Sequence, residues 1–456
     1  HRLLLNKLNR YGGRMNNVNE FVNKKVLVAG MKASGISAAT LLKREGATVL
    51  CYDDKIQSLT GFDFIALPDE ETIKSYYAVV VSPSIPPKHP IIVRAKRAGV
   101  QILGELELGC RYLDCPTVMV TGTNGKTTVV TMIEKLLQSA GMKTKAVGNI
   151  GYPVCQLVLD DVKPDCAVVE VSSFQLEYAS VKPHVAVILN LAPDHMDRYA
   201  KYEDYVATKR KICENQTEKD FLIFNNDDGA ARKFVRSTKA KGIPVTTNGK
   251  FAEVYIKDNY FMCGDKTLCP VKACRLKGEH NKFNMLVALN VGALLGLNSD
   301  LFPNLIRSYS LLPNRIEYVT TLDGKSYYND SKGTNIHACR YAIESLDGTI
   351  GLIMGGSDKN EDFCDFFENI SPKVKQVAIT GGNAEKIFNS AMKMGFCEAR
   401  IFETLKNAVN YLAGCDGINN VLLSPCCASF DRYRNYAERG DKFKEAVYAV
   451  KPTDRG

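Results

Sequence analysis

The segment VTGTNGKTT, residues 120–128, constrains the fold of this chain more than any other feature. The apolar run before it predicts a strand that ends at Thr121, and a glycine turn follows. Apolar residues then recur at helical spacing, at Val129, Val130, Ile133, Leu136 and Leu137. A strand that enters a helix through a glycine turn is typical of α/β domains.

This turn has the composition of a phosphate-binding loop. Backbone N–H groups at such a helix start, together with the helix dipole, attract phosphate. Lys126 would then reach the β- and γ-phosphates of ATP, and the Thr127 hydroxyl would ligate Mg²⁺. The loop is a shortened variant of the Walker pattern, because Val120 stands where that pattern has glycine. The alternative is a glycine-rich turn with an incidental Lys-Thr pair. The predicted ATP loop comprises Gly122, Thr123, Asn124, Gly125, Lys126, Thr127 and Thr128.

Alternating strand and helix patterns extend over the rest of the chain. At roughly 150 residues per domain, 456 residues correspond to about three domains. We predict an α/β protein with a Rossmann-like first domain, a P-loop ATPase-like central domain and a Rossmann-like last domain. The expected bounds are 21–104, 105–311 and 312–456, preceded by a poorly ordered extension at 1–20.

Composition narrows the class of protein. No window approaches about 18 uninterrupted apolar residues, which argues against a membrane span. The apolar run Leu3–Leu5 is too short for a signal peptide, and the 15 cysteines form no CxxC pair. The net charge of +9 lies in no basic run with interleaved aromatic residues, which argues against nucleic acid as a partner. We expect a cytoplasmic protein with reduced thiols.

The first domain carries a competing motif. Gly30, Gly35 and Asp53 resemble a dinucleotide fingerprint, which would suggest a nicotinamide-dependent oxidoreductase. Lys32 replaces the middle glycine, however, and would prevent close approach of the backbone to a pyrophosphate. That function would also leave the loop at 120–128 without a purpose.

Two further strand ends carry groups that could bind a metal. Glu170 should end a strand parallel to the strand of the ATP loop, where it could complete a Mg²⁺ shell beside Thr127 or simply face solvent. Asp194, His195 and Asp197 follow another strand end. From the residues alone, His195 could be a metal ligand, a base or a structural hydrogen-bonding group.

GTNGKTT after a strand resembles the ATP loop of the Mur ligases and folylpolyglutamate synthases, a family of ADP-forming amide ligases. Other segments match that family in the same order, from about residue 25 to the end. SFQLE, DHMDRY and SPCCASFDRYRNYAERG are similar to the members that add D-glutamate to UDP-N-acetylmuramoyl-L-alanine. A sister amide ligase is the nearest alternative, although no DNPR-like diamino-acid motif is present. The matching segments are EVSSFQLE (170–177), LNLAPDHMDRY (189–199), ATKRKICEN (207–215), GEHNKFN (278–284), LPNRIE (312–317), NDSKGTN (329–335), GGSDKNEDF (355–363) and LLSPCCASFDRYRNYAERGDKF (422–443).

The resemblance implies a metal and ATP site with two Mg²⁺ ions. It makes His195 a ligand of the second ion and Lys209 a lysine that carries CO₂ as a carbamate and bridges to that ion. The residues alone do not choose among Lys209, Arg210 and Lys211, which could form a solvated helix face. The implied catalytic residues are Lys126, Glu170, His195 and Lys209, and the implied ATP contacts outside the loop are Asn281, Arg315 and Asp330.

The resemblance also implies the sites of the other two substrates. A helix starting at SPCCASFD, with Ser429 as its N-cap, would suit the carboxylate of D-glutamate. Phe430 and Tyr436 stand where many relatives have other apolar or aromatic residues. We expect a monomer that binds UDP-N-acetylmuramoyl-L-alanine, D-glutamate and ATP in the cytoplasm. The implied UDP-substrate contacts are Ser34, Asp53, Asp54, Lys55, Ser82, Pro83 and Asn149, and the implied D-glutamate contacts are Lys332, Thr334, Lys359, Ser429, Phe430 and Tyr436.

Overall fold

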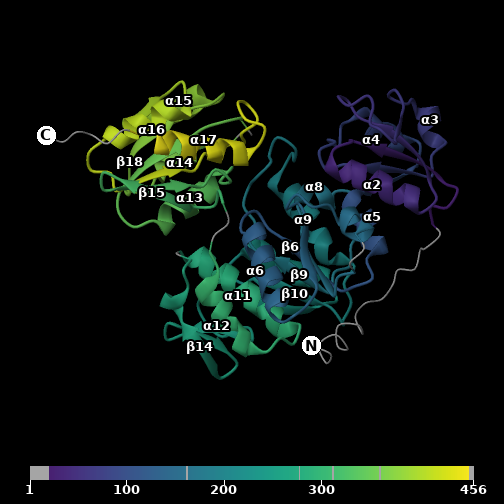
Figure 1. Ribbon diagram of the computed structural model, residues 1–456, viewed down its shortest axis with the longest axis horizontal. Coiled ribbons are helices and arrows are strands. Elements are labelled where there is room, and N and C mark those ends of the chain that lie inside the picture. Colours follow the sequence, from purple (N-terminus) through teal and green to yellow (C-terminus); the bar gives the residue numbers. More distant parts are fainter. Residues whose placement is uncertain (1–19, 161–162, 277, 311–312, 359–360, 451–456) are drawn as a thin grey trace. The chain divides into compact units, whose positions relative to one another are not determined.

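A computed structural model describes residues 20–160, 163–276, 278–310, 313–358 and 361–450 (Figure 1). The expected extension at 1–20 lies almost wholly outside the described residues. The chain divides into two compact units, and each is described by itself. Unit 1 comprises residues 1–191, 202–273 and 283–307, and unit 2 comprises residues 192–201, 274–282 and 308–456.

The first part of unit 1 is a parallel five-stranded sheet of order β3-β2-β1-β4-β5. The chain leaves β1 toward β2 on one side and later crosses to β4 on the other, so the strand order reverses between β1 and β4. Ligands of open α/β sheets bind at such a reversal, beyond the carboxyl ends of the strands. The elements are β1 (Lys25–Ala29), α2 (Ala33–Arg44), β2 (Thr48–Tyr52), β3 (Asp63–Phe64), α3 (Glu70–Lys74), β4 (Ala78–Val81), α4 (Pro90–Arg97) and β5 (Gln101–Gly104).

The second part of unit 1 is a parallel six-stranded sheet of order β11-β10-β9-β6-β8-β7. Its central strands are buried apolar runs, as expected where helices cover both faces of a parallel sheet. The predicted strand and helix of the ATP loop are confirmed as β6 and α6, in the middle of this sheet. The elements are α5 (Glu105–Tyr112), β6 (Thr117–Thr121), α6 (Lys126–Ser139), β7 (Thr144–Gly148), α7 (Val154–Leu159), β8 (Cys166–Glu170), α8 (Ser173–Leu176), β9 (Val185–Ile188), α9 (Tyr202–Glu214), β10 (Phe221–Asn225), α10 (Gly229–Lys233) and β11 (Lys241–Val245).

A small antiparallel sheet, which the sequence patterns did not predict, follows β11 in the chain. Its strands are β12 (Val254–Lys257), β13 (Tyr260–Cys263) and β14 (Lys266–Pro270). Asp258 and Asn259 form the two-residue turn between the first two strands, both with positive φ, which is a frequent hairpin signal. The helices α11 (Glu279–Leu294) and α12 (Phe302–Ser308) come next in the chain.

Unit 2 is built on a six-stranded sheet of order β15-β16-β20-β17-β18-β19, in which only the β15–β16 pair among the described strands is antiparallel. The last strand along the chain, β20, lies between β16 and β17, so the loops after these three parallel strands share one edge of the sheet. The elements are β15 (Glu317–Leu322), β16 (Lys325–Asn329), α13 (Ile336–Ser345), β17 (Ile350–Met354), α14 (Phe363–Glu368), β18 (Val374–Ile379), α15 (Ala384–Lys393), β19 (Ala399–Ile401), α16 (Leu405–Gly414), β20 (Asn420–Leu423) and α17 (Tyr436–Tyr448).

Three sheet-based α/β regions therefore succeed one another along the chain, as the sequence predicted. The domain bounds at 104/105 and 311/312 stay a prediction. Of the helices in the described ranges, none is both long and apolar enough to cross a membrane.

Candidate active site

The glycine turn between β6 and α6 has the backbone of a phosphate-binding loop. Gly122 and Gly125 both have positive φ, at 151° and 85°, where a side chain would be strained. Lys126 is the first residue of α6, and its Nζ donates to the carbonyl oxygens of Gly122 and Thr123, both at 2.8 Å. The next residue in α6, Thr127, is buried. The loop can thus present a lysine, a hydroxyl and helix N–H groups to one anion.

Two residues that sequence reasoning missed hold this loop. Asn190, just after β9, accepts from Thr123 N through its carbonyl at 2.7 Å and from Asn124 N through Oδ1 at 2.9 Å. Tyr205 in α9 shares a hydrogen bond with Thr123, with 3.0 Å between the two hydroxyl oxygens. Asn190 lies within the segment LNLAPDHMDRY, which matches the family, but this asparagine was assigned no role from the sequence.

Glu170 lies where the sequence predicted, at the carboxyl end of a strand parallel to that of the loop. In the β6–β8 pairing its partner is Val120, one residue before the end of β6. The carboxylate is buried, and Oε1 accepts from Asn149 Nδ2 at 2.9 Å. Asn149, predicted as a substrate contact, therefore also orients the acid beside the loop.

The structure distinguishes the three basic residues that the sequence left open. Lys209 is 2% exposed, and its Nζ donates to Gly122 O at 3.0 Å and to Thr121 Oγ1 at 3.3 Å. Arg210 instead pairs with Glu214 on the exposed side of α9, and Lys211 Nζ donates to Glu177 O at 2.9 Å. Only Lys209 of the three points at the ATP loop.

The donor set around the loop fits magnesium better than a soft metal. Within the described ranges, no three or more His, Cys, Asp or Glu side chains cluster as a metal site. Mg²⁺ needs no such cage, since it is commonly held by one or two carboxylates, a hydroxyl, water and substrate phosphates. Thr127 and Glu170 are oxygen donors of that kind, so the residues present fit the ion.

The first sheet gathers predicted UDP-substrate contacts at its strand reversal. Ser34 follows β1, Asp53, Asp54 and Lys55 follow β2, and Ser82 and Pro83 follow β4. The Asp53 carboxylate accepts from Met31 N at 2.7 Å and from Lys55 N at 2.9 Å. Burial alone would raise the pKa of Asp53, but these backbone bonds and one from Ile56 hold it below its usual value. Asp54 accepts from Tyr52 Oη at 2.8 Å, and hydrogen bonds from Tyr52 and His89 lower its pKa.

Unit 2 contains the loop that carries His195. His195 has a left-handed backbone, with φ at 59°, and its Nε2 lies 3.6 Å from Asp194 Oδ2. Asp194 also accepts from Asn335 Nδ2 at 3.3 Å, which ties this loop to the start of α13. The role of His195 as a metal ligand stays a prediction. Asn281 also belongs to unit 2, and its predicted contact with ATP likewise stays a prediction.

Arg315 and Asp330, both assigned to ATP by the resemblance, lie together in unit 2. Asp330 is buried, which raises the pKa of its carboxyl to about 7 despite hydrogen bonds from Ser424 and Ile316 and the charge of Arg315. The Nε of Arg315 is buried without a hydrogen-bond partner among the described residues. A buried guanidinium N–H of this kind is costly unless a ligand pairs with it.

Loops at the carboxyl edge of the third sheet bring predicted D-glutamate residues together. The Lys332 ammonium lies 5.0 Å from the centre of the Tyr436 ring, and Ser331 Oγ donates to Tyr436 O at 2.7 Å. Gly333 O accepts from Cys426 N, which joins the loop of Lys332 and Thr334 to the segment that carries Ser429 and Phe430. Lys359 lies outside the described residues, although the turn that leads to it is described.

One local prediction for this region was wrong. No helix begins at Ser429; α17 begins at Tyr436, and its N-cap is Asn435, whose side chain accepts from Glu438 N at 3.0 Å. Ser429 instead opens a tight turn, in which its carbonyl accepts from Arg432 N and Tyr433 N. Asn435 rather than Ser429 is therefore the N-cap of the helix in this segment.

A buried arginine that sequence reasoning missed supports these loops. Arg439 in α17 is 3% exposed and donates to the carbonyl oxygens of Gly355, Cys427, Ala428 and Ser331. Burial lowers its pKa to about 10, so it stays charged at neutral pH. No periodic or motif signal separates it from the other arginines of the recognised segment.

Backbone strain is concentrated on the candidate-site loops. Asn23, Asp258, Asn259 and Asp323 have positive φ, as Asn and Asp often do in turns. His195 also has positive φ, and His is enriched in this region as well, whereas Ile316 and Cys426 have positive φ although their residue types rarely adopt it. Such strain persists only where the surroundings enforce it, and it is frequent at functional sites.

Two families of protein domains match the chain: the Mur ligase middle domain over residues 120–292, and the glutamate ligase domain of Mur ligases over residues 314–427. The chain is 37% identical over 449 residues to the UDP-N-acetylmuramoylalanine--D-glutamate ligase of Caldanaerobacter subterraneus subsp. tengcongensis, covering 94% of this chain and 99% of that protein. A related protein of the same name from Acidobacterium capsulatum is 36% identical over 450 residues, covering 94% of this chain and 97% of that protein.

The fold is also shared with solved ligase structures. MurF from Acinetobacter baumannii matches with a TM-score of 0.61 at 14% identity, over 96% of this chain and 92% of that chain. The MurF ligase of Thermotoga maritima, solved in complex with ADP, matches with a TM-score of 0.59 at 17% identity, over 98% of this chain and 99% of that chain. At these identities the likeness shows the fold alone.

Proposed function

The chain belongs to the Mur ligase family, and from that premise we propose that it joins D-glutamate to UDP-N-acetylmuramoyl-L-alanine, with conversion of ATP to ADP and phosphate. It is then an ADP-forming acid–amino-acid ligase of peptidoglycan precursor synthesis. The observation that carries this proposal is the convergence of Lys126, Glu170 and Lys209 on the glycine turn after β6.

The reaction is an amide ligation through an acyl phosphate. The alanyl carboxylate of the UDP-substrate takes the γ-phosphoryl group of ATP, and the amine of D-glutamate then displaces phosphate to form the amide. Lys126 places a positive charge where negative charge develops on the transferred group, and such preorganised charge is usually the largest contribution to rate. Mg²⁺, held by Thr127 and Glu170, supplies further charge neutralisation at the phosphates when bound.

The three regions divide the substrates between them. Residues 21–104 bind the uridine and phosphate portion through Ser34, the Asp53–Lys55 turn, Ser82 and Pro83. Residues 105–311 hold ATP on the loop at 122–128, and Asn149 contacts the UDP-substrate. Residues 312–456 bind D-glutamate, and they do so through Lys332, Thr334, Lys359, Ser429, Phe430 and Tyr436. ATP is also contacted by Arg315 and Asp330 of this region and by Asn281, which precedes it in the chain. The enzyme acts as a monomer in the cytoplasm.

Lys209 carries CO₂ as a carbamate. Its burial favours this chemistry, because only the neutral amine reacts with CO₂ and burial disfavours the ammonium form. The modification turns the Lys209 ammonium into an anion, and this anion and His195 are the groups that would hold a second Mg²⁺ ion. Arg210 and Lys211 have no part in it.

Substrate dependence tests the function most directly. Phosphate release should require ATP, UDP-N-acetylmuramoyl-L-alanine and D-glutamate together, with L-glutamate, lysine and meso-diaminopimelate nearly inert. Equal turnover with a diamino acid would move the protein to a sister ligase. A change in NADH absorbance without ATP would support the oxidoreductase alternative.

The carbamate is tested by the variant Lys209→Ala. We expect it to lose nearly all activity and to recover part of it in acetate, since a short carboxylate can occupy the vacated position. Mass spectrometry of the intact wild-type protein, kept in bicarbonate, should show added CO₂ that Lys209→Ala lacks. Arg210→Ala and Lys211→Ala are the matched controls and should be mild without rescue. Full activity of Lys209→Ala, or rescue of all three variants alike, would mean that acetate does not replace a carbamate at Lys209, and the carbamate would be wrong.

A further inference from the structure

We propose that Asp431, which neither the family pattern nor the comparisons assign, is a positioning residue for the D-glutamate site. Its carboxylate fixes the loop 424–435, which carries Ser429 and Phe430, to the glycine turn before α15. The inference rests on the proposed function, since it names a further residue that serves the same amino-acid site.

The contacts of Asp431 join segments that lie far apart in the chain. Its Oδ2 accepts from Gly382 N at 2.8 Å, and Ser357 Oγ lies 3.5 Å from Oδ1. A Cβ on Gly381 would come within 2.9 Å of Oδ2, so glycine is what allows the carboxylate to approach this turn. The acid therefore connects its loop to the turns that follow both β17 and β18.

The Asp431 carboxylate binds Gly382 N, which lies two residues before the first residue of α15. Its N-cap residue, Asn383, makes no side-chain hydrogen bond to the helix. The Asn383 side chain instead accepts from Gly356 N at 3.1 Å and donates to Cys427 Sγ at 3.1 Å. The loop and the helix start thus bind each other at two points, one through Asn383 and one through Asp431.

The anchored loop is the one that presents the predicted glutamate contacts. The Ser429 carbonyl accepts from Arg432 N and Tyr433 N, so Asp431 lies inside a turn that begins at Ser429. Ser429 is buried, whereas the neighbouring Phe430 is 76% exposed and gains little support from packing. Release of the Asp431 carboxylate would therefore loosen the turn that begins at Ser429 and carries Phe430.

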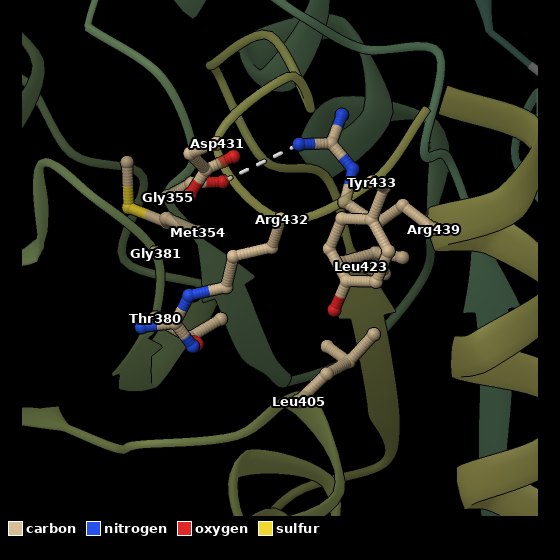
Figure 2. A pocket seen from close by; sticks show the side chains of 11 residues that line it. Met354, Gly355, Thr380, Gly381, Leu405, Leu423, Asp431, Arg432, Tyr433 and Arg439 are labelled. Atoms are coloured by element: carbon tan, nitrogen blue, oxygen red, sulfur yellow. Dashed lines mark hydrogen bonds between the residues drawn. The ribbon is translucent and has the colours of Figure 1, made fainter. Parts of the chain in front are cut away.

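A small cavity lies at the carboxyl edge of the third sheet, and open α/β sheets bind their ligands at this edge. Gly355, Gly356 and Gly381 line it at the carboxyl ends of β17 and β18. Figure 2 shows Asp431 beside Gly355, and Arg432 extending past it toward Thr380. Arg432 donates to Thr380 Oγ1 at 3.3 Å and to the carbonyl of Glu403. The Asp431 carboxylate thus accepts the backbone N–H of the glycine turn, as a phosphate does at a nucleotide site.

The test compares Asp431→Ala and Asp431→Asn with the wild-type enzyme, by measuring KM for each substrate, kcat and the unfolding temperature. Loss of a charged hydrogen bond should raise KM for D-glutamate about tenfold in Asp431→Ala. Asp431→Asn keeps an oxygen acceptor for Gly382 N, so it should lie between wild type and Asp431→Ala. KM for ATP should stay within about twofold of wild type in both. Glu385→Ala is the matched control, since Glu385 is an exposed acid in the first turn of the same helix.

Three results would overturn the proposal: an unchanged KM for D-glutamate in Asp431→Ala, an equal rise of KM for all three substrates, or the same rise in Glu385→Ala. If Asp431→Ala does not fold, the Asp431→Asn enzyme carries the test by the same criteria. Failure of the proposed function is distinguishable, because wild-type enzyme would then show no dependence on D-glutamate at all.

Discussion

Two glycine turns in this protein join a parallel strand to a helix, yet they are used in opposite ways. At Gly122–Gly125 the helix begins with Lys126, and the loop is held from behind by Asn190. At Gly381–Gly382 a carboxylate of the chain itself, that of Asp431, accepts the backbone N–H. The first turn offers positive charge to a ligand, whereas the second already binds an internal anion.

The difference teaches that a strand, a glycine turn and a helix do not by themselves define a nucleotide site. Whether such a turn can bind a ligand anion depends on the charged side chain that lies at it, a lysine in the first turn and an aspartate in the second. A third case lies in the first sheet, where Asp53 accepts from Met31 N in the turn after β1. There the acid comes from the next strand end, as it does in dinucleotide folds. Asp431 comes from a loop 49 residues away.

The largest expected effect tests the cationic turn. Lys126→Ala should lower ATP-dependent phosphate release by about 10²-fold or more, because the lysine acts on charge that develops in the transition state. The unfolding temperature should stay close to that of wild type. Lys135→Ala, an exposed lysine on the same helix, is the control and should keep full activity. If Lys126→Ala kept more than about a tenth of the wild-type rate, the turn at Gly122–Gly125 would not differ from the turn at Gly381–Gly382 in the way described above.

A second test uses Glu105, an acid that caps a helix start in unit 1. Its Oε1 accepts from Cys155 N at 2.6 Å near the start of α7, and burial raises its pKa to about 7. Between its ordinary pKa of 4.5 and about 7, the folded protein keeps a proton that the unfolded chain releases. Stability should therefore fall as pH rises through this window, by about 3 kcal/mol for this group.

The pH dependence of the unfolding temperature, measured from pH 5 to 8, checks this expectation. Glu105→Gln cannot titrate, so its curve should be flatter than that of wild type. Parallel curves for the two proteins would show that Glu105 stays ionised, like Asp53, in spite of its burial.

The third test measures how tightly the second turn is packed. Gly381→Ala would place a Cβ 2.6 Å from Gly356 N, whereas a Cβ on Gly395 would meet no atom within 4 Å. Both glycines have positive φ, so the difference between the two alanine variants isolates the clash. We expect Gly381→Ala to be the less stable by about 1–2 kcal/mol, seen as a lower unfolding temperature. Equal unfolding temperatures would mean that the turn can relax away from Gly356.

The smallest expected effect concerns Asp53. Its lowered folded pKa means that its contribution to stability is present above the unfolded pKa and is lost as pH falls through the folded value. Asp53→Asn should therefore lower the unfolding temperature slightly at neutral pH, and the two proteins should converge as pH falls through the folded pKa of Asp53. A constant difference from pH 7 to 2 would assign the loss to packing rather than to charge.

Much of the fold was predictable because its signals act over a few residues. The strand before Thr121, the helix after Lys126 and the strand ending at Glu170 follow from apolar runs and glycine positions, and all are where the sequence placed them. The hairpin strands at 254–270 were missed because they are short and part polar. The N-cap at Ser429 was wrong because a nearby asparagine competes for the same role.

The sequence by itself determined the alternation of strands and helices in the three α/β regions, the glycine turns and the family, since local periodicity and motif spacing depend on neighbouring residues. Only the tertiary structure decided which of Lys209, Arg210 and Lys211 faces the ATP loop, and that Asp431 binds the turn before α15. Each of these choices joins atoms 49 to 87 residues apart in the chain. Contacts at that separation depend on how the sheets and helices pack, and no local pattern records them.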